Sequence, residues 1–348
     1  MSFESIQFYD IAQAIFLIPF LYLLTQYIFK QIKEKHDFFS VKLMNRLFFY
    51  HLFFGAAYYI YALFNRSDSH KYFTWPQNEN KSWLDFLGTE TTFINFVSYP
   101  FINGLGFSYE MMMLLFAWIG FMGFVFAYLF FKENISLNVT VFKRIDLLSL
   151  ILFLPNMHFW TASLGKGALI FLGLMLFAYS ITKPKKRILG LFIGSLLVFS
   201  IRPHIFLLLA LGSLVGFMAG KELALKMKLI VCSAILAGLF ILQDQILSVV
   251  NLNNSQNLIA DFINFTSNRS EALGNAGSGV QMAGYSLPEK IFTFWFRPLF
   301  FDAPGILGVI VSIENLIYIL LFLKIFKKNF FSCMKNCLHK VLQSKKSA

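Results

Sequence analysis

The chain has 348 residues, of which 57% are hydrophobic and 14% charged, and its mean hydropathy is +0.63. Soluble domains are nearer to about 45–50% apolar and about 25% charged, so a water-soluble fold of this composition would expose more apolar surface than such proteins tolerate. A disordered chain, a secreted disulfide scaffold and an ordinary cytosolic enzyme are excluded, and an all-α, polytopic membrane protein is predicted.

The net charge of +12 does not indicate nucleic-acid binding, because the basic residues fall between apolar spans. Of the 30 Lys and Arg residues, 22 lie in five segments, 30–46, 132–144, 183–187, 221–228 and 324–346. These segments hold only four of the 18 acidic residues, which is typical of cytoplasmic loops under the positive-inside rule. For the acid-free tail after Glu314 we expect contact with anionic lipid headgroups, with a partner protein as the alternative.

With these loops inside and about 20 residues per span, the sequence predicts about nine spans, with the N-terminus outside and the C-terminus inside. The first ten residues lack Lys and Arg, so no cleaved signal peptide is expected. Full-length spans are predicted over residues 8–29, 43–64, 108–131, 229–250 and 305–326.

Two short apolar runs in the middle of the chain predict broken helices. Residues 145–154 cover about 15 Å before Pro155, half of a ~30 Å membrane core, and the next run begins only after Lys166. Residues 188–201 likewise stop at Arg202-Pro203-His204, and residues 205–220 lead back. Non-helical backbone at this depth must be covered by protein or line a wet cavity, so the functional site is predicted here, in the outer half of the membrane.

Outside the spans, two segments are expected to be interfacial or re-entrant. Residues 93–107 are broken by a proline and two glycines, and residues 291–301 are aromatic but too short to cross. The sequence therefore predicts one transmembrane domain over 1–330, with external loops 65–107 and 251–304, and a basic cytoplasmic tail over 331–348.

The sequence contains no Gly-x-x-x-x-Gly-Lys-Ser/Thr segment and no dinucleotide-binding glycine pattern between a strand and a helix. Cys333, Cys337 and His339 lie together in the basic tail, where a reduced cytosolic pair is favoured over a zinc site. No external pair of carboxylates offers a cradle for magnesium. We therefore expect neither a metal nor a cofactor.

The external side is marked instead by basic residues. A single one would be interpreted as a side chain that reaches towards the headgroups from a helix end. Together they predict an anion clamp, because two stand beside a histidine at the end of a truncated span and the Arg-Pro dipeptide occurs twice. The predicted clamp consists of Lys166, Arg202, Arg297 and Arg269.

Such a clamp suits a diphosphate, since guanidinium forks match phosphate oxygens and an ammonium adds a point charge. A common diphosphate ligand at the outer leaflet of a bacterial inner membrane is a glycan carried on a polyprenyl diphosphate. Transfer of that glycan also needs a proton acceptor, for which His204 is the first candidate and His158 the second. The alternative for either histidine is a hydrogen bond to a buried carbonyl. Trp160 is a candidate platform for a sugar, with an interfacial aromatic belt as the alternative.

The segment Pro155 to Lys166, with Trp160-Thr161-Ala162-Ser163 inside it and Arg202-Pro203-His204 after it, resembles the Pro…Trp-Ser-Ser/Gly…Lys and later arginine pattern of bacterial O-antigen and exopolysaccharide polymerases. The resemblance covers residues 146–326. It implies an inverting, metal-independent transfer on undecaprenyl-diphosphate-linked repeats at the outer face of the inner membrane. Relatives often place an acidic residue after the lysine, where this chain has Gly167.

Two other classes stay open at this point. A transporter or flippase for polysaccharide precursors would also need paired broken helices and buried charge. A structural subunit of a membrane assembly would need no clamp. Homo-oligomers and partners from polysaccharide assembly are compatible with either class.

Overall fold

The computed structural model describes residues 8–78, 80–135, 139–141, 145–219, 285–303 and 305–325, together with single positions between 226 and 282. The chain divides into two compact units, Met1–Val249 and Val250–Ala348. The predicted span 229–250 lies largely outside the described residues, and the tail 331–348 lies wholly outside them.

The described residues of the first unit form helices and two antiparallel strands of two residues each, β1 (Thr140–Val141) and β2 (Ile145–Asp146). Its helices are α1 (Phe8–Lys35), α2 (Val41–Phe64), α3 (Asp68–Thr74), η2 (Trp75–Gln77), η3 (Trp83–Phe86), α4 (Thr91–Tyr99), η4 (Pro100–Gly104), α5 (Tyr109–Asn134), α6 (Leu147–Leu152), α7 (Pro155–Thr161), α8 (Lys166–Ile181), α9 (Ile188–Ile201) and α10 (Pro203–Ala219).

In the second unit, the described helices are α13 (Leu287–Phe296) and α14 (Gly305–Ile325). Ser286 begins α13 with a capping box, since its backbone N–H donates to the Glu289 carboxylate at 2.7 Å. The rings of Trp295 and Phe296 pack on Phe322 of α14, with centroids 6.4 and 5.5 Å away. α13 thus covers the first half of the predicted interfacial segment 291–301 and begins four residues before it.

Among the described residues, four helices, α1, α2, α5 and α14, are long and apolar enough to cross a membrane. A fifth crossing is obtained if α7 and α8, which are bent by 114° at a short break, form one broken span. α9 and α10 are apolar but shorter. The prediction of an all-α membrane protein is confirmed in this coarse form, and the predicted break between Pro155 and Lys166 is present.

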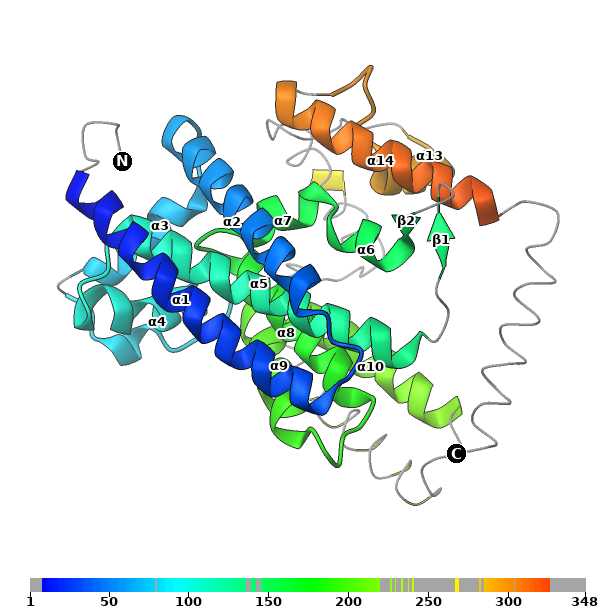
Figure 1. The fold of residues 1–348 in the computed structure, drawn as a ribbon, viewed down its shortest axis with the longest axis horizontal. Helices are drawn as coiled ribbons and strands as arrows, with labels where there is room; N and C mark the ends of the chain where they lie inside the picture. Colours follow the sequence, from blue (N-terminus) through cyan, green and yellow to red (C-terminus); the bar gives the residue numbers. More distant parts are fainter. Residues whose placement is uncertain are drawn as a thin grey trace, which may run out of the picture. The chain divides into compact units, whose positions relative to one another are not determined.

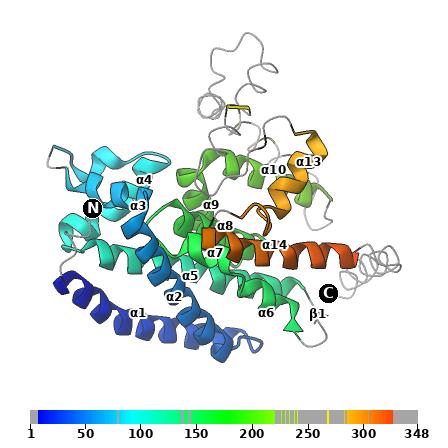
Figure 2. The same ribbon diagram turned by 90° about the horizontal axis from the view of Figure 1, so that it is seen from above.

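α5 lies between α1 and α8 in the first unit (Figures 1 and 2). The close approach of these helices depends on glycine. A Cβ atom at Gly120 of α5 would overlap the carbonyl oxygen of Thr161, and one at Gly123 would lie 2.5 Å from the Phe171 ring. A Cβ atom at Gly194 of α9 would lie 2.7 Å from the backbone nitrogen of Phe177 in α8. Glycines therefore set the spacing of α5, α8 and α9.

Replacing Gly120 by alanine is expected to lower the thermal stability of the detergent-solubilised protein, because the new methyl group would push the end of α7 away from α5. Overpacking of this kind costs about 1–3 kcal/mol. Gly212→Ala in α10 is the matched control, since no described atom lies within 4 Å of the methyl group that it adds. An unchanged melting temperature for Gly120→Ala would contradict the packing described above.

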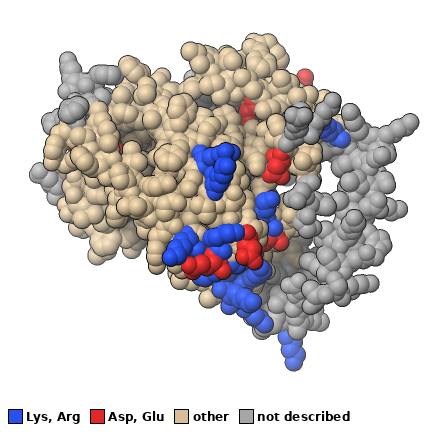
Figure 3. All heavy atoms as spheres, in the orientation of Figure 1, with Lys and Arg blue, Asp and Glu red and all other residues tan. Residues whose placement is uncertain are grey.

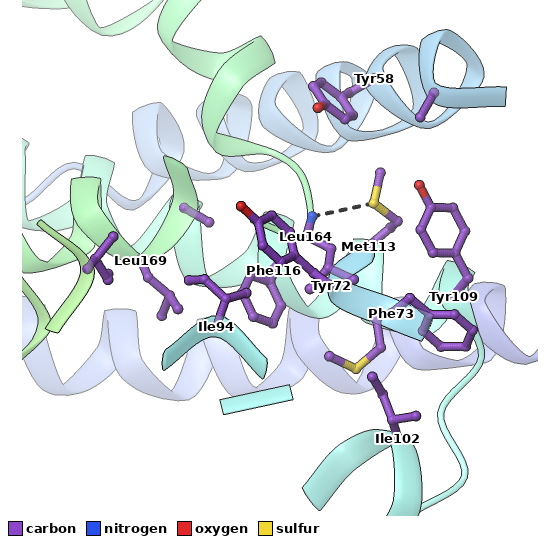
Figure 4. Packing of buried hydrophobic residues seen from close by; sticks show 14 of the residues in the cluster. Tyr58, Tyr72, Phe73, Ile94, Ile102, Tyr109, Met113, Phe116, Leu164 and Leu169 are labelled. Atoms are coloured by element: carbon purple, nitrogen blue, oxygen red, sulfur yellow. Dashed lines mark hydrogen bonds between the residues drawn. The ribbon is translucent and has the colours of Figure 1, made fainter. Parts of the chain in front are cut away.

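Two groups of buried side chains form the core of the first unit. One joins α3, α4, α5 and the 162–165 turn, and Figure 4 shows Phe116, Ile94 and Leu164 packed together within it. The other lies further along α5 and includes Phe29, Phe48, Phe121 and Tyr128. The first group includes Leu164, Ala168 and Ile201, which belong to the segments in which the sequence predicts the functional site.

A cluster of polar side chains lies beyond the C-terminal end of α8. Glu133, which is 7% exposed, accepts two hydrogen bonds from Arg187 at 2.6 and 2.9 Å and one from Lys183 at 3.1 Å. His36 Nδ1 lies 3.4 Å from the same carboxylate, and the Arg187 guanidinium stacks 3.6 Å from the Tyr179 ring. In Figure 3, charged side chains gather towards the C-terminal end of α1, where His36 follows. We call this the Glu133 cluster.

Candidate functional site

Three helix ends bring the predicted residues of the first unit together. α8 begins at Lys166, directly after the bend from α7, and α9 ends at Ile201 with Arg202 as its C-cap. Pro203 then begins α10, as expected for a residue whose fixed φ and missing N–H suit the first helical position. His204 is the second residue of α10 and lies outside the candidate spans.

The turn between α7 and α8 is covered by protein. Ala162, Ser163 and Leu164 are all buried, and the Leu164 N–H donates to the Met113 sulfur at 3.4 Å (Figure 4). Irregular backbone at membrane depth persists under this kind of cover. The cover holds the start of α8, and with it Lys166, in place.

Gly167 fits this position for a steric reason. A Cβ atom there would overlap the carbonyl oxygen of Trp160, so the first turn of α8 lies directly against the end of α7. An acidic side chain directly after the lysine would therefore have no room in this chain.

A carboxylate reaches Lys166 from another element. The Lys166 ammonium donates to Glu90 Oε2 at 3.5 Å, and the backbone N–H of Glu90, the N-cap of α4, donates to the Ser200 carbonyl oxygen of α9 at 2.6 Å. Glu90 has φ of 58° and ψ of −118°, an uncommon conformation for any residue other than glycine. Strained backbone of this kind costs about 1–3 kcal/mol and occurs preferentially at functional sites.

Arg202 and His204 share this region. Both residues lie at the junction of α9 and α10, to which the Glu90–Lys166 pair is joined by the bond from the Glu90 N–H to the Ser200 carbonyl oxygen. We call Lys166, Glu90, Arg202 and His204 the Lys166 cluster. Partial burial lowers the pKa of His204, and the neighbouring Arg202 lowers it further. His204 Nδ1 is buried and has no hydrogen-bond partner among the described residues.

His158 lies in the core instead. Its side chain is fully buried, with Nε2 2.7 Å from the Leu152 carbonyl oxygen and Nδ1 2.8 Å from Nδ1 of His51. Its ring stacks on Phe124 with centroids 4.0 Å apart. These contacts match the alternative of a histidine that bonds a buried carbonyl, and they leave His204, two residues after Arg202, as the histidine of the Lys166 cluster.

Trp160 is 47% exposed at the end of α7, where its ring meets Tyr58 and Phe159 edge-on. Trp160 lies shortly before Lys166 in the sequence, and the exposed face of its ring is available to a ligand. Neither a sugar platform nor an interfacial belt is favoured by these contacts, so the role of Trp160 stays a prediction.

Arg297 belongs to the second unit. Its guanidinium donates to Asp302 Oδ2 at 2.6 Å and to the Tyr285 hydroxyl at 3.0 Å. The Tyr285 hydroxyl and the Asp302 carboxylate both raise the pKa of Arg297. Arg269 lies outside the described residues. A clamp that joins Arg297 or Arg269 to the Lys166 cluster stays a prediction.

In the described ranges, no three His, Cys, Asp or Glu side chains converge as a metal site would require. Cys333, Cys337 and His339 lie outside these ranges. The site is therefore described through its own charged groups.

Comparison of the chain with protein-family models, with curated proteins and with solved structures finds no match in any of the three. The class of the protein is thus defined by the fold alone: a helical protein with several helices that suit a membrane.

Proposed function

We propose that the chain is a membrane glycosyltransferase that acts on polyprenyl-diphosphate-linked glycan repeats at the outer face of a bacterial inner membrane, in the synthesis of a surface polysaccharide. The observation that carries the proposal is the Lys166 cluster. Lys166 lies at the start of α8, and Arg202 and His204 lie at the junction of α9 and α10. The contacts of Glu90 to Lys166 and to Ser200 join these helix ends, which supports the predicted anion site.

The two cations account for the binding of the donor. The Arg202 guanidinium can hold two phosphate oxygens at once, and the Lys166 ammonium adds a second positive charge beside it. Both charges also stabilise the diphosphate as it departs from the sugar, because negative charge develops on its oxygen during the transfer. The existing Lys166–Glu90 pair is partly exposed and worth about 0–1 kcal/mol, so a phosphate can replace it on Lys166 at little cost.

The proposal includes an orientation. The Glu133 cluster follows the C-terminal end of α8 and contains residues of the basic segments 30–46 and 183–187. We place it at the cytoplasmic face, and Lys166, at the other end of α8, towards the cell exterior. The nine predicted spans and the outside N-terminus belong to the same proposal.

Analysis of lipid-linked oligosaccharides in a strain that lacks the gene tests this function. Loss of long glycan chains, with single lipid-linked repeats accumulating on the outer face, is the expected result. Unchanged chain length in the deletion strain would contradict the proposal. Re-expression of the wild-type chain must restore long chains, which is the control for effects on neighbouring genes.

A flippase for the same lipid-linked repeats is the second candidate. It is favoured by the 114° bend between α7 and α8, because transporters commonly build their sites from broken helices. The same deletion strain separates the two functions, since a flippase would leave the repeats on the inner face of the membrane.

A further inference from the structure

Glu90 is the one acidic side chain of the Lys166 cluster, and the sequence-based candidates did not include it. Its side chain is 42% exposed, against 22% for Lys166, so the carboxylate lies on the open side of the pair. Its position is fixed through the backbone, because the bond from the Glu90 N–H to the Ser200 carbonyl joins it to the end of α9, two residues before Arg202. An incoming ligand held by Lys166 and Arg202 would therefore meet this carboxylate.

The backbone of Glu90 strengthens the case for a role beyond folding. Glycine would adopt φ of 58° without strain, and a glutamate in this conformation destabilises the fold. The salt bridge to Lys166 is too weak to offset this cost, since exposed pairs contribute about 0–1 kcal/mol. The presence of glutamate at this position is thus poorly explained by stability.

We propose, building on the proposed glycosyl transfer, that Glu90 is the proton acceptor of the reaction. The Glu90 carboxylate takes the proton from the hydroxyl group of the acceptor sugar, and that oxygen forms a bond to the anomeric carbon of the donor. The bond between the anomeric carbon and the phosphate oxygen breaks on the opposite side, and its electron pair stays on the diphosphate held by Lys166 and Arg202. The proton on Glu90 then passes to water.

His204 is the competing acceptor, and its surroundings favour Glu90. The Glu90 carboxylate lies 3.5 Å from the Lys166 ammonium and is 42% exposed, so it is open to an acceptor hydroxyl group beside the bound diphosphate. His204 instead has one ring nitrogen buried. His204 is then assigned to orienting the neighbouring groups.

The test uses the full-length protein in vesicles that contain the lipid-linked repeat as substrate. Glu90→Gln is expected to reduce kcat at least about 100-fold, the usual contribution of a general base, while KM changes by less than about threefold. His204→Gln is expected to reduce kcat by about tenfold or less. Glu90→Asp should retain more activity than Glu90→Gln, because it keeps a carboxylate.

Glu90→Gly separates catalysis from folding. Glycine suits the backbone conformation, so this variant should unfold at or above the temperature of the wild type, although it lacks the acceptor. Added sodium formate should restore part of its rate by supplying a carboxylate. Wild-type kcat in Glu90→Gln, or a change in KM alone, would overturn the assignment of Glu90 and leave the proposed function standing. A wild-type protein that transfers no glycan would overturn both.

Discussion

Replacing Arg202 by alanine is expected to reduce glycan transfer about 10²–10³-fold, the loss that follows removal of one group that stabilises developing negative charge. The fold should persist, because the hydrogen bonds that Arg202 makes at the end of α9 involve its backbone. Its N–H donates to Val198 at 2.9 Å, and its carbonyl oxygen accepts from Ile205 at 3.0 Å. The measurement is glycan chain length in cells, together with the rate of transfer in vesicles.

Two further variants sharpen this experiment. Arg202→Lys keeps the charge but loses the two-pronged geometry, so it should recover only part of the activity. Arg66→Ala removes an exposed guanidinium just beyond the end of α2, outside the Lys166 cluster, and should transfer glycan at the wild-type rate. Equal activity of Arg202→Ala and Arg66→Ala would exclude Arg202 from anion binding.

Replacing Glu133 by alanine is expected to destabilise the protein by about 1–3 kcal/mol, the usual cost of leaving a hydrogen-bonded group without its partner. Arg187 would lose both of its hydrogen bonds to the carboxylate, and the end of α5 would lose its link to the segment between α8 and α9. The thermal unfolding of the detergent-solubilised variant measures this loss.

Lys183→Ala is the matched control, because Lys183 binds the same carboxylate but is 51% exposed. An exposed partner contributes about 0–1 kcal/mol, so this variant should unfold close to the wild-type temperature. A similar loss of stability in both variants would show that the Glu133 cluster is held together by its surface partners rather than by the buried pair.

The helical framework could be predicted from the sequence because hydropathy and length act locally. The predicted spans over 8–29 and 43–64 fall within α1 and α2, and those over 108–131 and 305–326 overlap α5 and α14. The break before Lys166 was also predictable, since Pro155 and the short apolar run before it rule out a straight crossing. No helix was predicted within the polar external stretch 65–92. The structure nevertheless forms the short helix α3 there.

The candidate site could be predicted only in part. Arg202 and His204 are separated in sequence only by Pro203, so their proximity at the junction of α9 and α10 could be predicted. Glu90 lies 76 residues before its partner Lys166, so the sequence does not show that the two side chains meet. Its positive φ could not be predicted either, because glutamate is not a residue that favours this conformation. Only its negative charge within an external stretch pointed to a role in the site. His158 could not be separated from His204 by sequence, because the side of α7 that faces the core depends on the packing of Phe124 and His51.

The length of α8 has a consequence for the surrounding lipid. Its 16 residues rise about 24 Å, whereas the hydrocarbon core of a typical bilayer is about 30 Å thick. In the proposed orientation, with the Glu133 cluster at one boundary and α8 along the membrane normal, Lys166 would lie several ångströms below the other boundary, unless the bilayer thins around the protein. Short-chain phospholipids form a thinner bilayer and would relieve this mismatch. The acyl-chain length of the vesicle would then set the distance between the membrane surface and the Lys166 cluster, which a phosphate must cross to be bound.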